Sequence, residues 1–194
     1  YAAEDGMRYV LSLVARDKEE LKGEIDRSFK GVERAYAEGR DWRTPRGSAF
    51  TAKPLGAGGL TFVYPGAFNA YVGLGRELFS HFPFLYGALK DLVLDLETAT
   101  AARYLYPRTR AVPDDETQAV WAANLQDDPV AMMESGTTFA VAYTRILRDV
   151  FGLEAKFAMG YSLGEGSMLW GTGVWSDGDE GSANLHRSSL FDDR

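Results

Sequence analysis

The sequence predicts an α/β fold built on a parallel sheet. Short apolar segments typical of buried strands alternate with longer segments whose apolar residues recur at helical spacing. Two of the short segments, residues 60–64 and 157–159, are each followed by a turn that contains glycine. In sheets of this kind, ligands bind beyond the carboxyl ends of the strands. We therefore expect the turns after Tyr64 and Met159 to lie at one edge of the sheet.

The composition is that of a globular protein, with 45% hydrophobic and 25% charged residues. A net charge of −7 and the lack of a basic run argue against nucleic acid as a partner. The absence of cysteine excludes disulfides and thiol chemistry, and two histidines argue against a histidine-rich metal centre, so we expect no metal. Proline, asparagine and glycines interrupt the longest uncharged stretch, residues 54–75, which argues against a membrane span. The chain begins without a signal peptide, and we expect it to be cytoplasmic.

Residues 1–58 are expected to form a small strand–helix module. Residues 7–15 are rich in β-branched and aromatic residues, which is typical of a buried strand. Asp17, with an acidic residue three positions later, predicts a helix N-terminus, and Gly39 predicts its end. One apolar face recurs at helical spacing along this helix: Leu21, Ile25, Phe29, Val32 and Tyr36. Residues 41–59 are rich in proline and glycine and predict a connecting segment.

Residues 59–194 are expected to form the larger part, which opens with a buried strand over residues 60–64. Helices are expected from about residue 74 to Pro83, over residues 84–104, from Asp114 to Leu125, and over residues 135–150. The last of these has the clearest apolar periodicity and is followed by Gly152. The second strand comes directly after it.

The pentapeptide Gly160-Tyr-Ser-Leu-Gly164 has the form G-x-S-x-G, between an apolar strand and a segment that can begin a helix. That order is what a nucleophile elbow requires. We expect Ser162 at the tip of the turn, with the N–H of Leu163 directed at an oxyanion formed on an attacked carbonyl. The alternative is a purely structural turn, because glycine and serine are common turn residues. Glu165 can then cap its helix without a catalytic role.

Three further segments resemble the opening of malonyl/acyl-transferase domains from fatty acid and polyketide synthases. They are Phe62-Val-Tyr-Pro-Gly-Ala-Phe-Asn69, Gly73-Leu-Gly-Arg-Glu-Leu78 and Phe82-Pro83, where that family reads F-x-F-P-G-Q-G, M-G-R-E-L and F-P. The serine motif resembles the family's G-H-S-L-G-E. Arg187 follows Ser162 by 25 residues, which is the separation between the family's serine and its carboxylate-binding arginine. The resemblance is greatest to the acyltransferases of polyunsaturated fatty acid synthases.

The resemblance implies that residues 59–194 form part of an α/β-hydrolase-like acyltransferase core, and that residues 1–58 form the linker module before it. It implies that Ala67, at the position of the family glutamine, and Leu163 supply the oxyanion N–H groups. Arg187 would bind a malonyl carboxylate. Tyr161 replaces the family histidine in the lining of the substrate pocket.

The implied reaction is transfer of an acyl group from a CoA thioester to Ser162 and on to the phosphopantetheine of an acyl carrier protein, with malonyl as the expected acyl group. No tightly bound cofactor is expected, and the implied partners are the carrier protein and neighbouring domains such as a ketosynthase. The family's catalytic histidine and its ferredoxin-like subdomain would lie beyond Arg194. Neither His81 nor His186 matches the histidine's place, so the isolated chain is expected to be inactive.

Two other functions remain open on the sequence. A serine thioesterase or hydrolase could use the same turn, although its order is Ser, acid, His and no HGGG-type loop is present. The other alternative is a non-catalytic structural piece of a synthase. Arg187 would then be a solvated charge on a helix. The aromatic side chains around the serine segment are expected to lie in the core: Phe139, Phe157, Trp170 and Trp175.

Overall fold

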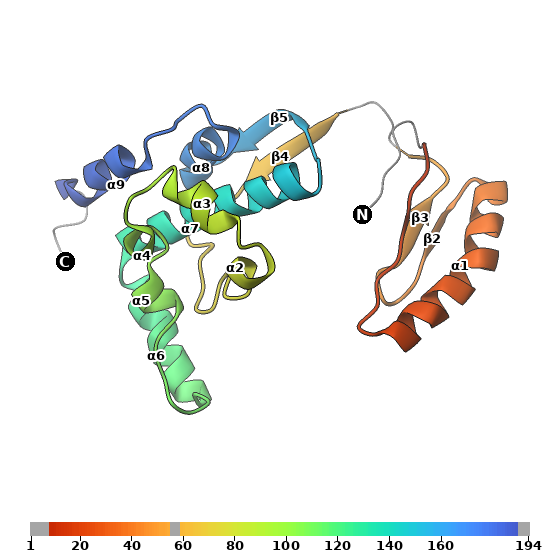
Figure 1. Cartoon of the computed structure of the whole chain (residues 1–194), viewed down its shortest axis with the longest axis horizontal. Coiled ribbons are helices and arrows are strands. Elements are labelled where there is room, and N and C mark those ends of the chain that lie inside the picture. Colours follow the sequence, from red (N-terminus) through yellow and green to blue (C-terminus); the bar gives the residue numbers. More distant parts are fainter. Residues whose placement is uncertain (1–7, 55–58, 190–194) are drawn as a thin grey trace. The chain divides into compact units, whose positions relative to one another are not determined.

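The computed structural model describes residues 8–54 and 59–189 of the chain. It divides into two compact units, Tyr1–Gly59 and Leu60–Arg194, which are described separately (Figure 1).

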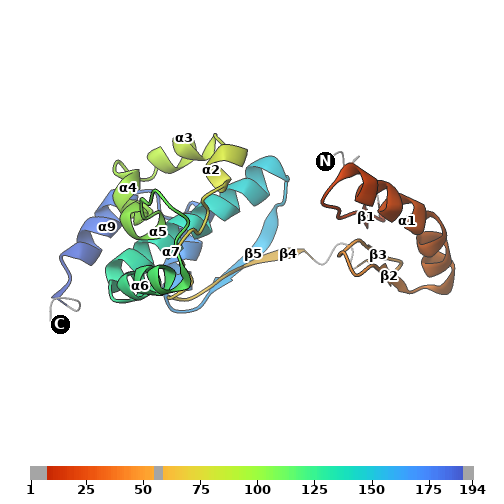
Figure 2. The same ribbon diagram turned by 90° about the horizontal axis from the view of Figure 1, so that it is seen from below.

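Unit 1 is a three-stranded antiparallel sheet with one helix. It contains β1 (Leu11–Ser12), α1 (Lys18–Glu38), β2 (Asp41–Arg43) and β3 (Ala49–Thr51), and the strand order is β1-β3-β2. Helix α1 lies along the strands (Figure 2). The α/β character expected of this part is present, and it is built on antiparallel pairs.

The predicted ends of α1 are confirmed. The Asp17 side chain accepts a hydrogen bond from the Glu20 N–H at 2.8 Å, and Gly39 ends the helix with φ of 64°. The left-handed conformation at Gly39 is one that glycine adopts without steric cost.

The face of α1 that packs inward differs from the apolar stripe in the sequence. Glu24 is fully buried and accepts hydrogen bonds from Thr44 at 2.7 Å and from Arg27 at 2.5 Å. Hydrogen bonds from the Ser48 and Thr44 hydroxyls hold the pKa of Glu24 below its usual range. The residues of the apolar stripe each come one position after the inward-facing residues of the helix. Most of the stripe is exposed: Leu21, Ile25, Phe29 and Tyr36.

Two predictions for unit 1 were wrong in extent. The strand expected over residues 7–15 is only Leu11–Ser12 and is exposed; residue 7 lies outside the described residues. The segment expected to be a connection contains β2 and β3. A turn with a hydrogen bond from the Gly47 N–H to the Thr44 carbonyl (3.0 Å) joins these two strands, so the proline and glycine mark a hairpin turn rather than a linker.

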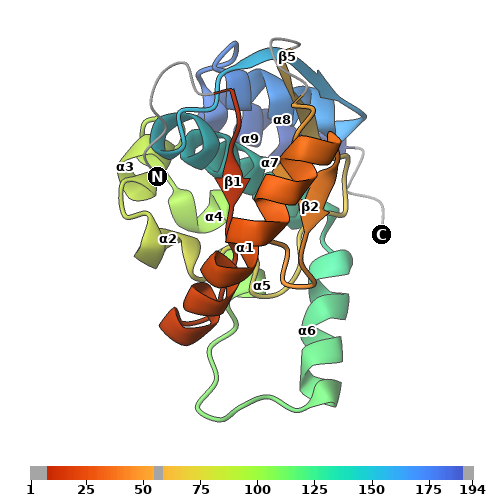
Figure 3. The same cartoon turned by 90° about the vertical axis from the view of Figure 1, so that its right-hand side faces the viewer.

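Unit 2 consists of two parallel strands and a set of helices. In chain order they are β4 (Leu60–Tyr64), α2 (Leu78–His81), α3 (Leu85–Lys90), α4 (Leu96–Ala99), α5 (Ala102–Leu105), α6 (Asp115–Gln126), α7 (Pro129–Arg145) with a π-helical continuation η2 (Ile146–Val150), β5 (Ala155–Gly160), α8 (Leu163–Thr172) and α9 (Gly178–His186). Figures 1 and 3 show α6 extending away from the strand pair. The unit is therefore mixed α/β with a small parallel sheet.

Helix α7 is the centre of the unit, with contacts to α3, α4, α6, α8 and α9. Asp128 caps its N-terminus by accepting from the Ala131 N–H at 2.9 Å, with Pro129 at the first helical position. The core around it consists mainly of Leu74, Leu85, Leu89, Leu105, Leu125, Met132, Phe139, Val141 and Ile146. The helix expected over residues 135–150 exists, but it begins six residues earlier.

The strands β4 and β5 were predicted at the correct places, and they pair in parallel with Tyr64 opposite Gly160. One face of the pair packs on the helices, where the Tyr64 hydroxyl lies 2.9 Å from Thr144 Oγ1 of α7. The other face exposes Val63, Phe157 and Met159. Burial on both faces, expected for a parallel strand, is therefore absent within the described residues. Phe157 is not a core residue, whereas Phe139 is.

The segment before α6 is less helical than the sequence predicts. The helix expected from residue 74 begins only at Leu78, because Gly73 and Gly75 have positive φ. The long helix expected over residues 84–104 is three short helices. It is interrupted where Asp95 caps α4 and where Ala101 has φ of 47°. Asp114 caps α6 as predicted.

Candidate active site

The turn of residues 160–164 (the Ser162 turn) joins β5 directly to α8. Ser162 has φ of 56° and ψ of −123°, a conformation that few non-glycine residues adopt. Hydrogen bonds from the Gly164 N–H to the Tyr161 carbonyl (2.9 Å) and from the Glu165 N–H to the Ser162 carbonyl (3.0 Å) close the turn. Such strain costs on the order of 1–3 kcal/mol and is concentrated at functional sites. Ser162 and Tyr161 are both exposed.

The two glycines of the turn allow the strand and the helix to approach each other closely. A Cβ on Gly160 would overlap the backbone of Gly164. A Cβ on Gly164 would overlap the carbonyl oxygen of Tyr64 and would lie 2.8 Å from that of Pro65. Helix α8 thus packs against the ends of both strands, and the contacts on either side of Ser162 are backbone contacts.

The loop after β4 lies beside the Ser162 turn, as the shared sheet edge predicts. A Cβ on Gly66 would be 3.8 Å from the Ser162 Cβ and 3.2 Å from the Tyr161 carbonyl oxygen. Phe68, two residues later, is another non-glycine residue with positive φ, 64°. The described residues offer no acceptor to the N–H of Ala67 or of Leu163. These N–H groups are therefore free to donate to a ligand.

Arg187 lies at the C-terminal end of α9 and is exposed. Its guanidinium forms no ion pair or hydrogen bond with residues 8–54 or 59–189. The preceding residue, His186, places Nε2 3.0 Å from Glu134 Oε1 of α7, and Ser182 Oγ donates to the same oxygen. The side chain of Glu134 is 7% exposed. This Glu134 cluster holds α9 on α7, but no described contact joins Arg187 to Ser162.

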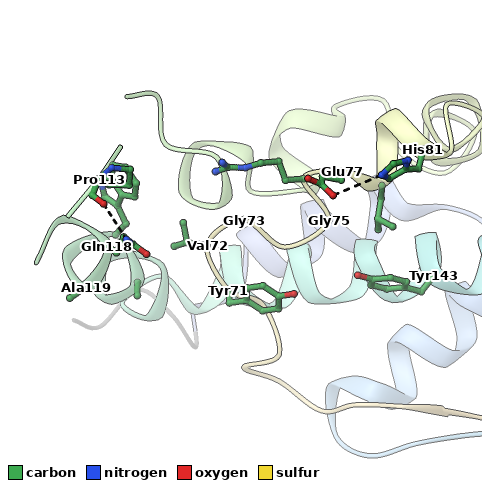
Figure 4. Close-up of a pocket in the computed structure, with 14 residues that line it drawn as sticks. Tyr71, Val72, Gly73, Gly75, Glu77, His81, Pro113, Gln118, Ala119 and Tyr143 are labelled. Carbon is green, nitrogen blue, oxygen red and sulfur yellow. Dashed lines mark hydrogen bonds and ion pairs between the residues drawn. The ribbon is translucent and has the colours of Figure 1, made fainter. Parts of the chain in front are cut away.

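A hollow of about 950 Å³ in unit 2 lies apart from the Ser162 turn, and His81 is one of the residues that line it (Figure 4). His81 Nε2 is 3.9 Å from Glu77 Oε2. Figure 4 shows the hydroxyls of Tyr71 and Tyr143 directed toward each other. Burial raises the pKa of Tyr143, and the neighbouring Tyr71 raises it further. Burial also raises the pKa of Tyr106, next to this hollow, to about 12, and its hydroxyl donates to the Leu74 carbonyl at 2.6 Å.

Neither histidine forms a hydrogen bond with Ser162, and both lie in the described part of the chain. In the same part, no group of three or more His, Cys, Asp or Glu side chains could hold a metal ion. The described helices are too short or too polar to cross a membrane.

Sequence reasoning missed the Glu134 cluster and the strained residue Phe68. A signal for the cluster was available, because Glu134 interrupts the apolar periodicity of α7, and Ser182 and His186 are four positions apart on one helix face. The positive φ of Phe68 has no comparable signal, because phenylalanine rarely takes that conformation.

The known proteins that resemble the chain include two synthases. One is a subunit of the polyunsaturated fatty acid synthase of Thraustochytrium sp., which is 28% identical over 163 residues, covering 84% of this chain and 8% of the synthase subunit. The other is a non-reducing polyketide synthase of Alternaria cinerariae, which is 31% identical over 135 residues, covering 70% of this chain and 6% of the synthase. The chain thus spans less than a tenth of the length of these relatives, and it is related to a segment of such synthases.

No protein-family model matches the chain. No solved structure matches it either.

Proposed function

We propose that the chain is part of an acyltransferase whose nucleophile is Ser162. The observation that carries the proposal is the backbone of the Ser162 turn, with a strained, exposed serine between a parallel strand and a helix N-terminus. This backbone supports the proposal, because a nucleophile elbow requires a serine at a sharp turn between a strand and a helix. The relation to fatty acid and polyketide synthases, whose chemistry uses acyl thioesters, supports acyl transfer as the reaction.

In the proposed first step, Ser162 Oγ attacks the thioester carbonyl of an acyl-CoA. The C–S bond breaks, CoA leaves as the thiol after taking up a proton, and the acyl group stays on the serine as an ester. The free N–H groups of Ala67 and Leu163 stabilise the oxyanion that forms on the carbonyl oxygen. In the second step, the phosphopantetheine thiol of a carrier protein attacks the ester and restores the serine hydroxyl.

Malonyl is the acyl group that we propose. The support is the guanidinium of Arg187, which has no partner among the described residues, since a planar guanidinium can bind a carboxylate through two parallel hydrogen bonds. The exposure of Arg187 leaves it accessible to a substrate. We propose that Arg187 lies close enough to the reacting carbonyl for its guanidinium to bind the malonyl carboxylate.

A serine hydroxyl needs a base to take its proton at neutral pH. Neither histidine forms a hydrogen bond with Ser162: His186 bonds to Glu134, and the exposed His81 has Glu77 as its nearest acidic partner, at 3.9 Å. We therefore expect the purified 194-residue chain not to turn over. The oxyanion donors alone leave a residual rate on the order of 10³ to 10⁴ above water in serine enzymes. Steady-state malonyl transfer by this chain, abolished in Ser162→Ala, would contradict this expectation.

The nucleophile is tested in the whole protein that contains this segment. Peptide mass spectrometry after incubation with malonyl-CoA should show an acyl adduct on the peptide of Ser162. The adduct should be absent from Ser162→Ala and retained in Ser176→Ala, a matched change at an exposed loop serine. An adduct that persists in Ser162→Ala would rule out the proposed nucleophile. Release to water faster than to a carrier thiol would instead indicate a thioesterase.

A further inference from the structure

Helix α1 of unit 1 carries its apolar stripe on an exposed side. The stripe consists of Leu21, Ile25, Phe29, Val32 and Tyr36. It extends over about 23 Å of the helix, at about 1.5 Å per residue, and Phe29 near its centre is 70% exposed. Tyr9 lies against one end, with its ring 5.3 Å from that of Tyr36. An amphipathic helix normally turns its apolar stripe toward a core, so an exposed stripe of this length indicates an interaction surface.

The charges that border the stripe differ from others on the helix. Three acidic residues elsewhere on α1 are paired within unit 1: Glu20 with Arg16 and Arg46, Glu24 with Arg27, and Glu38 with Arg34 and Arg40. Lys22 and Glu33 are both exposed, and neither forms an ion pair with residues 8–54 or 59–189. Each directly follows a stripe residue. Because successive helix residues are about 100° apart around the axis, both charges lie along the same edge of the stripe.

The apolar residues of the stripe complement one another in an antiparallel pair of helices. When two copies of α1 cross near Phe29 in opposite directions, Leu21 of each copy meets the partner's Tyr36. Ile25 likewise meets the partner's Val32. Aromatic and aliphatic side chains therefore alternate across the contact, with the two Phe29 rings at its centre.

The two charges fit the same arrangement. A two-fold axis at Phe29 brings the same edge of each helix together, and residue contacts across it occur twice. Lys22 then lies within one helical turn of the partner's Glu33, and the opposite pair forms by symmetry. A parallel pair would instead bring this edge against the sheet-facing edge of the other helix, so neither charge would meet its counterpart.

We propose that α1 is a docking surface for a second copy of this chain, with the two helices antiparallel and in contact through their stripes. The proposal goes beyond acyl transfer at Ser162 and does not depend on it. A single pair of five-turn helices buries less than the roughly 800 Å² per partner of a standard stable interface, so the dimer is weak, with a dissociation constant in the micromolar range or above.

The test is analytical ultracentrifugation of the 194-residue chain over a range of concentrations. All samples carry Val63→Lys, so that the exposed face of the β4–β5 pair does not contribute. Phe29→Lys should weaken dimerisation by roughly tenfold or more, because it places a charge at the centre of an apolar contact. The exposure of Phe29 means that this change leaves the fold of unit 1 intact.

The ion pairs are tested by exchanging their charges. Lys22→Glu should weaken dimerisation about tenfold, since two attractive pairs become repulsive. Lys22→Glu combined with Glu33→Lys should restore it. Lys30→Glu makes the same change in net charge on the side of α1 away from the stripe, so it is the matched control and should dimerise normally.

The direction of the helices is tested by disulfides, because the chain contains no cysteine of its own. With oxidised glutathione, Phe29→Cys should cross-link two copies, since its sulfur lies beside the two-fold axis. Leu21→Cys should not, because the two sulfurs would be about 23 Å apart along the helices, and a disulfide requires Cα atoms within about 7 Å.

Three results would overturn the proposal. The Val63→Lys chain could stay monomeric at every concentration, which would assign the stripe to another part of the whole protein. Lys22→Glu could dimerise as well as Lys30→Glu, or the double exchange could fail to restore the dimer. The two cysteine variants could cross-link to the same extent, which would exclude an antiparallel pair.

Discussion

The Ser162 turn and the C-terminal end of α9 are both singled out by spacing in the sequence, but the structure fixes them to very different degrees. At the turn, Gly160 and Gly164 allow close contacts between backbone atoms, and the loop that contains Gly66, after the neighbouring strand, lies against the turn. At the end of α9, one buried carboxylate, Glu134, holds the helix through two side chains, and Arg187 is exposed and unpaired within the described residues.

The difference shows which parts of a site a short motif can specify. The turn depends on glycines whose backbone neighbours follow from the parallel pairing of β4 and β5. The position of Arg187 depends on how a whole helix packs, which is set by side chains far away in the sequence. Changes at the turn should therefore affect the fold, whereas changes at the end of α9 should affect selectivity or local stability.

The largest effect is expected for Gly164→Ala. The added Cβ would overlap the carbonyl oxygens of Tyr64 and Pro65, which are backbone atoms and cannot move aside. We expect a loss of several kcal/mol in the free energy of unfolding, a large part of the stability of an ordinary domain. Denaturant unfolding measures this loss.

Gly166→Ala on the same helix is the matched control. A Cβ there meets the Trp170 ring at 3.5 Å and the Trp175 ring at 3.9 Å, which are ordinary contacts, so alanine should stabilise α8 by up to about 1 kcal/mol. If both variants unfold alike, close backbone packing at the turn is not the reason for its glycines.

The next largest effect is expected for Arg187→Ala in the whole protein. If the guanidinium binds the substrate carboxylate, malonyl transfer should lose on the order of 2–4 kcal/mol of transition-state binding. Acetyl transfer should lose much less, and the comparison is made through kcat/KM for the two donors. Arg110→Ala, at another exposed arginine, is the control. Equal losses for both donors would mean that Arg187 is structural.

A smaller effect is expected for Glu134→Gln. The amide keeps an acceptor oxygen for Ser182 and His186 but loses the charge, so α9 should be held less firmly by about 1 kcal/mol. Hydrogen exchange at the amides of α9 should accelerate about fivefold, with little change in the first turn of α8. Glu165→Gln, at an exposed position of α8, should leave α9 unchanged. Equal acceleration throughout unit 2 would contradict a local role for Glu134.

An equally small effect, of opposite sign, is expected for Ser162→Gly. Glycine accepts φ of 56° without steric cost, so the variant should be more stable by about 1 kcal/mol while losing the hydroxyl. Ser162→Ala keeps a Cβ at the same φ and should gain nothing. Thermal unfolding of the two variants separates them, and equal midpoints would show that Ser162 is not strained.

The sequence predicts the local elements of the fold well where one signal dominates. The caps at Asp17 and Asp114, the strand Leu60–Tyr64 and the order strand, turn, helix around Ser162 are all present. It predicts poorly where apolar residues suit several conformations. The exposed stripe of α1 is an example, because the fully buried Glu24 pairs with Thr44 across the unit and brings a different helix face inward.

Within the candidate site, the closeness of Gly66 to Ser162 follows from the parallel pairing of β4 with β5, so it can be predicted from the sequence. The Glu134 cluster is not, because it needs the packing of α9 on α7. The roles of Ser162, Ala67, Leu163, Tyr161 and Arg187 remain predictions. The structure describes their surroundings, and the variants of Ser162 and Arg187 above test the chemistry of those two residues.

The outward face of the β4–β5 pair has a consequence for handling the protein. Val63, Phe157 and Met159 are 69%, 61% and 57% exposed and lie together on that face. Each strand also has one edge without a partner strand in the described residues. Exposed apolar strands with free edges are templates for pairing with another chain. The purified 194-residue chain is therefore expected to self-associate as its concentration rises, with light scattering that falls when Val63 is replaced by lysine.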